Sequence, residues 1–307
     1  MNGGRKMTFR KLTGVLCALA VGVMILPTAS FAAGTTAATF LNLGINARAE
    51  AMGGAYVAKA DDASAVIINP AGMTQVKGQQ VFLMHNEWLL DVNQETLAYG
   101  TNQGDKAYGM GLVYVDYGQQ TETDITNNVL GYFTPVDYAL SFAYGVKSSE
   151  ILSYGVALKY VKVKIADYSD SSFALDAGVT YKPAVEGLTL GAVLAHLGTE
   201  LQLYQNADPL PLSLKLGARY DWKEMPLIST FDIFLIRDED PEYHFGLQYT
   251  VADIVPIRLG YNTGFDIADS KFTYGLGVEQ ENFALDYAFV PAGEFDDTHR
   301  FSLLFKF

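Results

Sequence analysis

The chain has 307 residues, and its 21 Lys and Arg against 34 Asp and Glu give a formal net charge of −13. This acidic balance argues against nucleic acid as a partner, because phosphates require basic groups. Half of the residues are hydrophobic, with 29 Gly, 19 Tyr and 18 Phe, so an intrinsically disordered chain is excluded. An acidic chain that is apolar on average and rich in aromatic residues and glycine is typical of strands that contact lipid.

The N-terminus has the features of a secretory signal peptide. Four basic residues among the first eleven precede the apolar run 12–26, and Ser30 and Ala32 supply a small-residue cleavage site. The run is short for a bilayer-spanning helix, which disfavours an uncleaved anchor. We predict cleavage of residues 1–32, which removes four bases and no acids, so the charge changes from −13 to −17. Cys17, the only cysteine, is also lost, and no disulfide is expected.

From about residue 78 onward, large apolar side chains alternate with small or polar ones, and this period of two predicts strands. In 138–146, for example, Tyr138, Leu140 and Phe142 share one face, whereas Ala139 and Ser141 lie on the other. We predict fourteen strands, near 79–87, 94–102, 106–116, 137–147, 152–164, 171–181, 188–196, 212–222, 228–236, 243–251, 255–262, 271–280, 282–290 and 299–307.

The small face of these strands distinguishes between two all-β folds. A soluble sandwich would carry a polar, charged outer face, whereas here one face is large and apolar and the other is rich in glycine. Those glycines are Gly109, Gly111, Gly145, Gly155, Gly178, Gly217, Gly246, Gly260, Gly275 and Gly277. The pattern predicts an all-β fold, a 14-stranded antiparallel transmembrane β-barrel formed by residues 78–307, whose inner face another chain segment approaches closely.

The connections between the predicted strands are short at one end of the barrel, and the longest ones, 117–136, 197–211 and 291–298, all fall at the other. We predict that this second end is extracellular. Its loops hold sixteen carboxylates and one base, Arg237. Such charge runs are usually solvated, and the alternative is bridging by divalent cations to lipopolysaccharide phosphates.

The last strand places Phe301, Phe305 and Phe307 on one face and ends on phenylalanine. It resembles the signal that the outer-membrane barrel assembly machinery reads. This resemblance implies an integral protein of a Gram-negative type of cell outer membrane, in contact with outer-membrane lipid and lipopolysaccharide.

Residues 33–77 do not follow the strand pattern. Gly53 and Gly54 permit a tight bend, and Asp61 or Asp62 is a candidate N-cap for a short helix that ends at residue 68. Asn69 followed by Pro70 is a second helix start. Because this small and apolar segment precedes a glycine-lined barrel, we predict that residues 33–77 form a plug, or hatch, inside the lumen.

Three sequence blocks in this segment carry a family resemblance. They are Arg48-Ala49-x-Ala51-Met52-Gly53-Gly54-Ala55-Tyr56-Val57-Ala58, then Ala60-Asp61-Asp62-Ala63-Ser64, then Asn69-Pro70-Ala71-Gly72-Met73. Together they resemble the PorV/PorQ family and are similar to the wider FadL/TodX group of hydrophobic-compound transporters. For FadL-like proteins the resemblance implies a hatch that gates a path for hydrophobic molecules, and for PorV-like proteins it implies a role in type IX secretion.

Several charged residues fall on the lumen face of the predicted barrel, namely Asp176, Lys215, Arg219, His244, Arg258, Glu279, Asp286, Arg300 and Lys306. We favour mutual pairing, because buried charges are normally paired. The alternative is a ligand site, in which Arg219, Arg258 and Arg300, with Lys215 and His244, bind the carboxylate head of an amphipathic molecule.

No histidine lies in a nucleophile motif or at metal-ligand spacing, so we predict a protein that is not an enzyme and has no cofactor or metal. The preferred hypothesis is passive binding and passage of small hydrophobic molecules through a plugged lumen. The alternative is a structural or secretion-accessory barrel that docks protein partners, favoured by the apolar loop segments 129–133 and 201–204. A soluble periplasmic β-protein is a third class.

Overall fold

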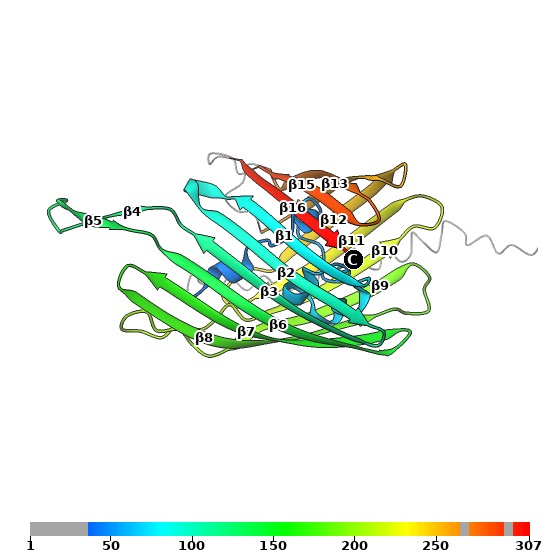
Figure 1. The fold of residues 1–307 in the computed structure, drawn as a ribbon, viewed down its shortest axis with the longest axis horizontal. Coiled ribbons are helices and arrows are strands. Elements are labelled where there is room, and N and C mark those ends of the chain that lie inside the picture. The colour runs from blue at the N-terminus through cyan, green and yellow to red at the C-terminus, as the bar shows by residue number, and fades with distance from the viewer. Residues whose placement is uncertain (1–35, 265–269, 292–296) are drawn as a thin grey trace, which may run out of the picture. The chain divides into compact units, whose positions relative to one another are not determined.

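A computed structural model describes residues 36–264, 270–291 and 297–307, and the predicted signal peptide lies outside them. Fourteen antiparallel strands form a closed barrel in which sequence neighbours pair (Figure 1). The first and last strands close it, because β1 (Gln79–Glu87) pairs with β16 (Thr298–Lys306). The predicted fold class is therefore confirmed.

The remaining barrel strands also lie where the alternation places them, with bounds that differ by at most three residues. They are β2 (Asn93–Gln103), β3 (Lys106–Asp116), β6 (Val136–Ser149), β7 (Leu152–Ile165), β8 (Tyr168–Tyr181), β9 (Leu188–Gly198), β10 (Ser213–Asp221), β11 (Leu227–Ile236), β12 (Glu242–Val251), β13 (Val255–Asn262), β14 (Phe272–Glu279) and β15 (Phe283–Val290).

The two ends of the barrel differ in their connections. We call the end with connections 117–135 and 199–212 the loop end, and the end with 150–151 and 182–187 the turn end. The predicted separation of long from short connections is thus present. A short 3-10 helix, η4 (Leu89–Asp91), lies in the first connection at the loop end.

One feature of the loop end was not predicted: the long connection 117–136 has regular structure of its own. It contains a two-stranded hairpin, β4 (Gln120–Thr123) and β5 (Val129–Phe133), which extends away from the barrel strands (Figure 1). Asp124 shapes its turn by accepting hydrogen bonds from the backbone N–H groups of Thr126 at 2.7 Å and Asn128 at 2.9 Å.

The barrel wall has one apolar face and one small or polar face. Phe142, Leu158 and Leu175 are direct neighbours in the register of β6, β7 and β8, and all three point outward and are about half exposed. Monomeric soluble proteins rarely expose so continuous an apolar surface, whereas a lipid-facing barrel wall requires it. Among the described residues, no helix is long and apolar enough to cross a membrane.

Four short helices precede the first strand, within what we call the N-terminal segment, residues 36–77. They are η2 (Thr39–Asn42), α2 (Ala47–Glu50), α3 (Ala65–Ile68) and η3 (Pro70–Gln75). Helix α2 contacts β14, β15 and β16, whereas η3 contacts β6, β7 and β8. These strands belong to two separate parts of the ring, so the segment lies on its inner side (Figure 1).

The outward face yields a prediction about depth. Leu158 lies in the middle of β7, and Ile165 is its last residue. An arginine on a lipid-facing wall costs about 2–4 kcal/mol at mid-depth and about 0–1 kcal/mol near the interface. We expect Leu158→Arg to lower the free energy of unfolding by about 3 kcal/mol and Ile165→Arg by less than about 1 kcal/mol, measured by guanidinium titration in lipid vesicles. Equal losses would argue against a lipid-facing wall.

Candidate functional site

The contact surface between the N-terminal segment and the inner barrel wall is the candidate site. The segment has little regular structure, so its backbone groups need partners outside it. Wall side chains supply them: Thr273 accepts from the N–H of Gly53 at 3.0 Å, and Asp232 accepts from the N–H of Val57 at 2.8 Å. Similar contacts join His244 to the carbonyl of Gly53, Gln80 to the N–H of Ala63, and Asn102 to the carbonyl of Thr74.

The inner face of the wall carries glycines, which have no side chain, where the segment approaches it. Nine of the ten predicted small-face glycines lie so close to the segment that an added Cβ would meet its atoms, Gly277 being the exception. For example, Gly145 and Gly155 face Pro70, and Gly246 faces Met52. The expectation that the glycines admit a second chain segment is therefore confirmed.

Gly53 and Gly54 form the predicted bend. Their φ angles are +67° and +84°, in the left-handed region that favours glycine. A Cβ on Gly53 would lie 2.7 Å from the backbone nitrogen of Tyr261. The pair therefore meets two needs, the backbone conformation and the close approach to β13.

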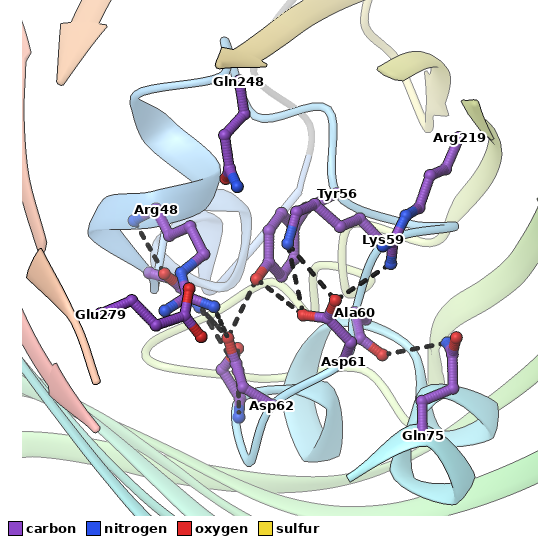
Figure 2. A network of polar contacts seen from close by, with 12 residues as sticks. Arg48, Tyr56, Lys59, Ala60, Asp61, Asp62, Gln75, Arg219, Gln248 and Glu279 are labelled. Carbon is purple, nitrogen blue, oxygen red and sulfur yellow. Dashed lines mark hydrogen bonds and ion pairs between the residues drawn. The ribbon is translucent and has the colours of Figure 1, made fainter. Parts of the chain in front are cut away.

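Asp61 lies at the centre of one group of charges that joins the segment to the wall (Figure 2). Its carboxylate accepts from Arg219 of β10 at 3.0 Å and from the amino group of Lys59 at 3.3 Å. Arg219 also binds Asp221 at 2.8 Å. Burial opposes ionisation of Asp61, but Lys59 and Arg219 outweigh it and hold its pKa well below the usual range. Burial lowers the pKa of Lys59 to about 8, although Asp61 acts in the opposite direction.

Arg48 lies at the centre of the second group of charges that joins the segment to the wall. Its guanidinium donates to Asp286 of β15 at 3.1 Å, and Arg258 of β13 donates to the other oxygen of the same carboxylate at 2.7 Å. Arg258 also donates to Gln248 at 2.8 Å. All of these groups are buried, so removal of one partner would leave an uncompensated charge.

Asp62 corrects one local prediction. Neither Asp61 nor Asp62 caps helix α3; Ser64 occupies the N-cap position and makes no side-chain cap. Asp62 instead accepts from the N–H of Ser64 at 2.9 Å, from Asn46 at 3.2 Å and from the hydroxyl of Tyr56 at 3.0 Å. Asp62 is therefore not the N-cap, but it bonds both to the N-cap residue Ser64 and to Asn46 and Tyr56 elsewhere in the segment, because these partners are within reach.

The second helix start is as predicted. Asn69 is the N-cap of η3, its side chain accepts from the N–H of Ala71 at 3.1 Å, and Pro70 is the first residue. Gly72 lies so close to Ala60 that a Cβ could not be accommodated. The motif residues Asn69, Pro70 and Gly72 thus fix the turn of the segment at β6 to β8.

The five candidate ligand-binding residues all contact protein groups. Arg219 and Arg258 bind the carboxylates above, and Arg300 binds Glu50 of the segment and donates to Asn86 at 3.2 Å. Lys215 lies over the ring of Phe234 at 4.7 Å, and His244 binds Gly53. The mutual pairing we favoured is present only in part: Arg258 pairs with Asp286 and Lys306 with Glu279. Arg219 and Arg300 instead pair with Asp61 and Glu50 of the segment. Binding of a ligand carboxylate by these residues stays a prediction.

Several residues of the site were not predicted. Asn46, Tyr56 and Lys59 are buried in the network of Figure 2 or beside it. Lys159 binds Asp176 at 2.6 Å, with both side chains at most 1% exposed. The inward position of Lys159 could have been predicted, because Lys159 lies four residues after Gly155 in the same strand and therefore on the same face.

The inner wall near the loop end is apolar. Phe40 and Ile45 of the segment pack there in one buried cluster with wall residues Val113, Val115, Ala139, Val161, Val163 and Ala174 and with loop-end residues Val92, Leu201 and Leu210. A cavity of about 290 Å³ lies beside the cluster at the loop end, lined in part by Ala37, Leu201 and Tyr204. The first part of the segment therefore occupies an apolar chamber that opens toward the loops.

Comparisons with known proteins agree with this architecture. A model described as "Uncharacterised protein family (UPF0164)" matches residues 19–173. No curated protein matches the sequence significantly.

Solved barrels are similar in fold. The CymD monoaromatic hydrocarbon channel has 15% identity and a TM-score of 0.60 over 86% of this chain and 98% of that chain. The Pseudomonas putida toluene transporter TodX has 13% identity and a TM-score of 0.61 over 85% and 97%. A Pseudomonas aeruginosa FadL homologue has 12% identity and a TM-score of 0.58 over 90% and 99%. The similarity to FadL/TodX-like barrels is thus supported, and the resemblance to the PorV/PorQ family is not confirmed.

Alanine substitutions at two glycines with positive φ test the close approach of the segment to the wall. Gly104 has a φ of +80° and open space around its Cβ position, whereas Gly53 faces backbone. Alanine in the left-handed region costs about 1–2 kcal/mol. We expect Gly104→Ala to lose this amount and Gly53→Ala at least about 2 kcal/mol more, because backbone atoms cannot yield. Guanidinium unfolding measures both, and similar losses would contradict the packing.

The lowered pKa of Lys59 predicts that the stability of the folded chain depends on pH. This pKa is about 8 in the folded chain and about 10.4 when unfolded. Between these values only the unfolded chain keeps the proton, so the free energy of unfolding rises with pH. We expect the melting temperature to rise from about pH 7.5 to about pH 9.5, and Lys59→Met to remove this rise. An unchanged rise in the variant would assign it to other groups.

Proposed function

The chain belongs to the uncharacterised protein family UPF0164, and we propose that it is a non-enzymatic outer-membrane barrel that binds small hydrophobic molecules and passes them through its lumen. The observation that carries the proposal is the apolar inner wall at the loop end. Barrels that conduct water and ions have polar interiors. Here Val113, Val115, Val161 and Val163 all face inward and are buried.

In this proposal residues 33–77 are the plug. The described part of the segment begins at the loop end, where the N–H of Ala37 donates to the carbonyl of Pro209 at 2.9 Å, and it reaches β1 at the turn end. The side chains of Phe40 and Ile45 fill the chamber that a cargo molecule would enter. An apolar cargo would replace these side chains at little net cost, because each Å² of apolar surface buried contributes about 25 cal/mol whichever molecule supplies it.

Passage further inward requires the segment to move. The ion pairs that join it to the wall are Asp61–Arg219, Arg48–Asp286 and Glu50–Arg300. All three segment residues follow Phe40 and Ile45 in the chain. We therefore place binding in the chamber and gating at the ion pairs, with the bend at Gly53 and Gly54 between the pairs of Arg48 and Glu50 and the pair of Asp61.

The membrane location rests on the outward face and the termini. The signal sequence would direct export, and β16 presents Phe301 and Phe305 on its outward face next to the terminal Phe307, as expected of a strand read by the barrel assembly machinery. Outer-membrane lipid would contact the wall, and lipopolysaccharide the acidic loops. The similar solved barrels are described as a hydrocarbon channel and a toluene transporter, which supports a hydrophobic cargo.

A specific observation also favours a second role, that of a secretion-accessory barrel of the PorV/PorQ type. The β4–β5 hairpin exposes Ile125, Val129, Leu130 and Tyr132, each by more than half of its surface. Exposed apolar side chains of this kind mark protein contacts. In this role the hairpin docks a secretion partner and the lumen carries nothing.

Deletion of residues 37–43 tests the preferred function. This variant keeps the ion pairs and Ile45 but removes Phe40 from the chamber, so we expect the refolded barrel to bind the fluorescent probe N-phenyl-1-naphthylamine several-fold better than the full chain. Val161→Glu in the same background should abolish the gain, because a carboxylate in an apolar chamber is strongly disfavoured. Fluorescence titration in vesicles measures binding, with heat-modifiable gel migration as the folding control.

The outcomes separate the two roles. Probe binding that is unchanged by the deletion would contradict the chamber. Loss of a co-purifying secretion partner on deletion of residues 120–133, with no probe binding by any variant, would favour the accessory role.

A further inference from the structure

A second cavity lies at the turn end, away from the apolar chamber. It has a volume of about 340 Å³ and lies between the end of the N-terminal segment and strands β6, β7 and β8. Four of its lining residues are cationic, namely Lys77, Lys147, Lys182 and Arg219. This concentration of bases is unexpected in a chain with 21 Lys and Arg against 34 Asp and Glu.

The floor of this cavity is a row of hydrogen-bond donors. Lys147, Ser153 and Thr180 are direct neighbours in the register of β6, β7 and β8. Ser153 is 8% exposed and Thr180 is 4% exposed, yet both line the cavity. Among the described residues, neither hydroxyl has a hydrogen-bond partner. These two residues are largely buried, yet their hydroxyls face the cavity and are available to a ligand.

The charges of the cavity do not cancel. Its two acids are already bound: Asp61 by Lys59 and Arg219, and Glu150 by Lys147 at 2.8 Å. Within the part of the chain that the structure describes, the amino groups of Lys77 and Lys182 make no ion pair. The cavity thus has an excess of positive charge next to neutral donors.

We propose that this cavity binds a small oxyanion, a phosphate or a carboxylate, from the aqueous phase at the turn end. Lysine ammonium groups supply point charges for such an anion, and hydroxyls supply directed hydrogen bonds. Its oxygens would lie over Ser153 and Thr180, between Lys147 and Lys182. This site shares Asp61 and Arg219 with the gate of the proposed function, but binding of the anion does not depend on the passage of a hydrophobic molecule.

The proposed anion site is connected to the N-terminal segment through Arg219. Arg219 lines the cavity and also holds Asp61 of the segment at 3.0 Å. A bound oxyanion competes with Asp61 for this guanidinium. The occupied site would therefore loosen the contact between the segment and β10.

Isothermal titration calorimetry with inorganic phosphate tests the proposal on the purified full-length protein at fixed ionic strength. We expect saturable binding that weakens about tenfold in Lys147→Gln/Lys182→Gln, because two charged donors are lost. Thr180→Val keeps the charge and the branched side chain, and we expect binding several-fold weaker. Acetate in place of phosphate establishes which of the two anions the site prefers.

Lys223→Gln is the matched control. Lys223 is exposed at the same end of the barrel, where it binds Glu186, and does not line the cavity. Its replacement should leave binding within about twofold. The proposal is overturned if neither anion binds saturably, if Lys223→Gln loses as much as the double variant, or if Thr180→Val binds as the wild type does. Heat-modifiable gel migration verifies that each variant is folded.

Discussion

The structure depends on one constraint: an irregular chain segment is enclosed by a barrel, and its backbone must find hydrogen-bond partners there. Buried N–H and C=O groups without partners are costly. Short helices satisfy only a part of the segment, so the wall supplies the rest through Thr273, Asp232 and Gln80. The inner face is consequently mixed, with glycines where the backbones approach and polar side chains where they bond. Neither a water-filled channel nor a dry core would require this combination.

The buried charges of the segment also find their partners on the barrel wall. Each ion pair between the segment and the wall joins residues far apart in sequence, such as Arg48 with Asp286 and Glu50 with Arg300. Removal of one member would leave the other buried and unpaired, so the pairs specify one position of the segment more than they add stability. Among the residues that the structure describes, the apolar chamber near the loop end has no such pair, and residues 37–45 are held there by packing and by the hydrogen bond from Ala37 to Pro209. The segment is thus fixed strongly at its centre and weakly at its start.

The fold was largely predictable because strand alternation is a local signal. Fourteen strands, their order and the glycine face were all readable from the sequence, and the helix start at Asn69–Pro70 needed only two adjacent residues. The partners of the site were less accessible. Which carboxylate Arg258 meets depends on the register around the ring, and Tyr56 and Lys59 have no pattern of their own. The error over Asp62 has the same origin, since its partner Asn46 lies sixteen residues earlier. The β4–β5 hairpin was missed because its strands are only four and five residues long.

The closing seam has a consequence for biogenesis. The segment continues directly into β1, and β1 pairs with β16 to close the ring. Helix α2 of the segment contacts β14 to β16, and η3 contacts β6 to β8 on another part of the ring. We infer that the segment is laid against the sheet before β1 and β16 pair, because the closed ring surrounds it. Formation of the β1–β16 pair would then both close the ring and retain the N-terminal segment inside it.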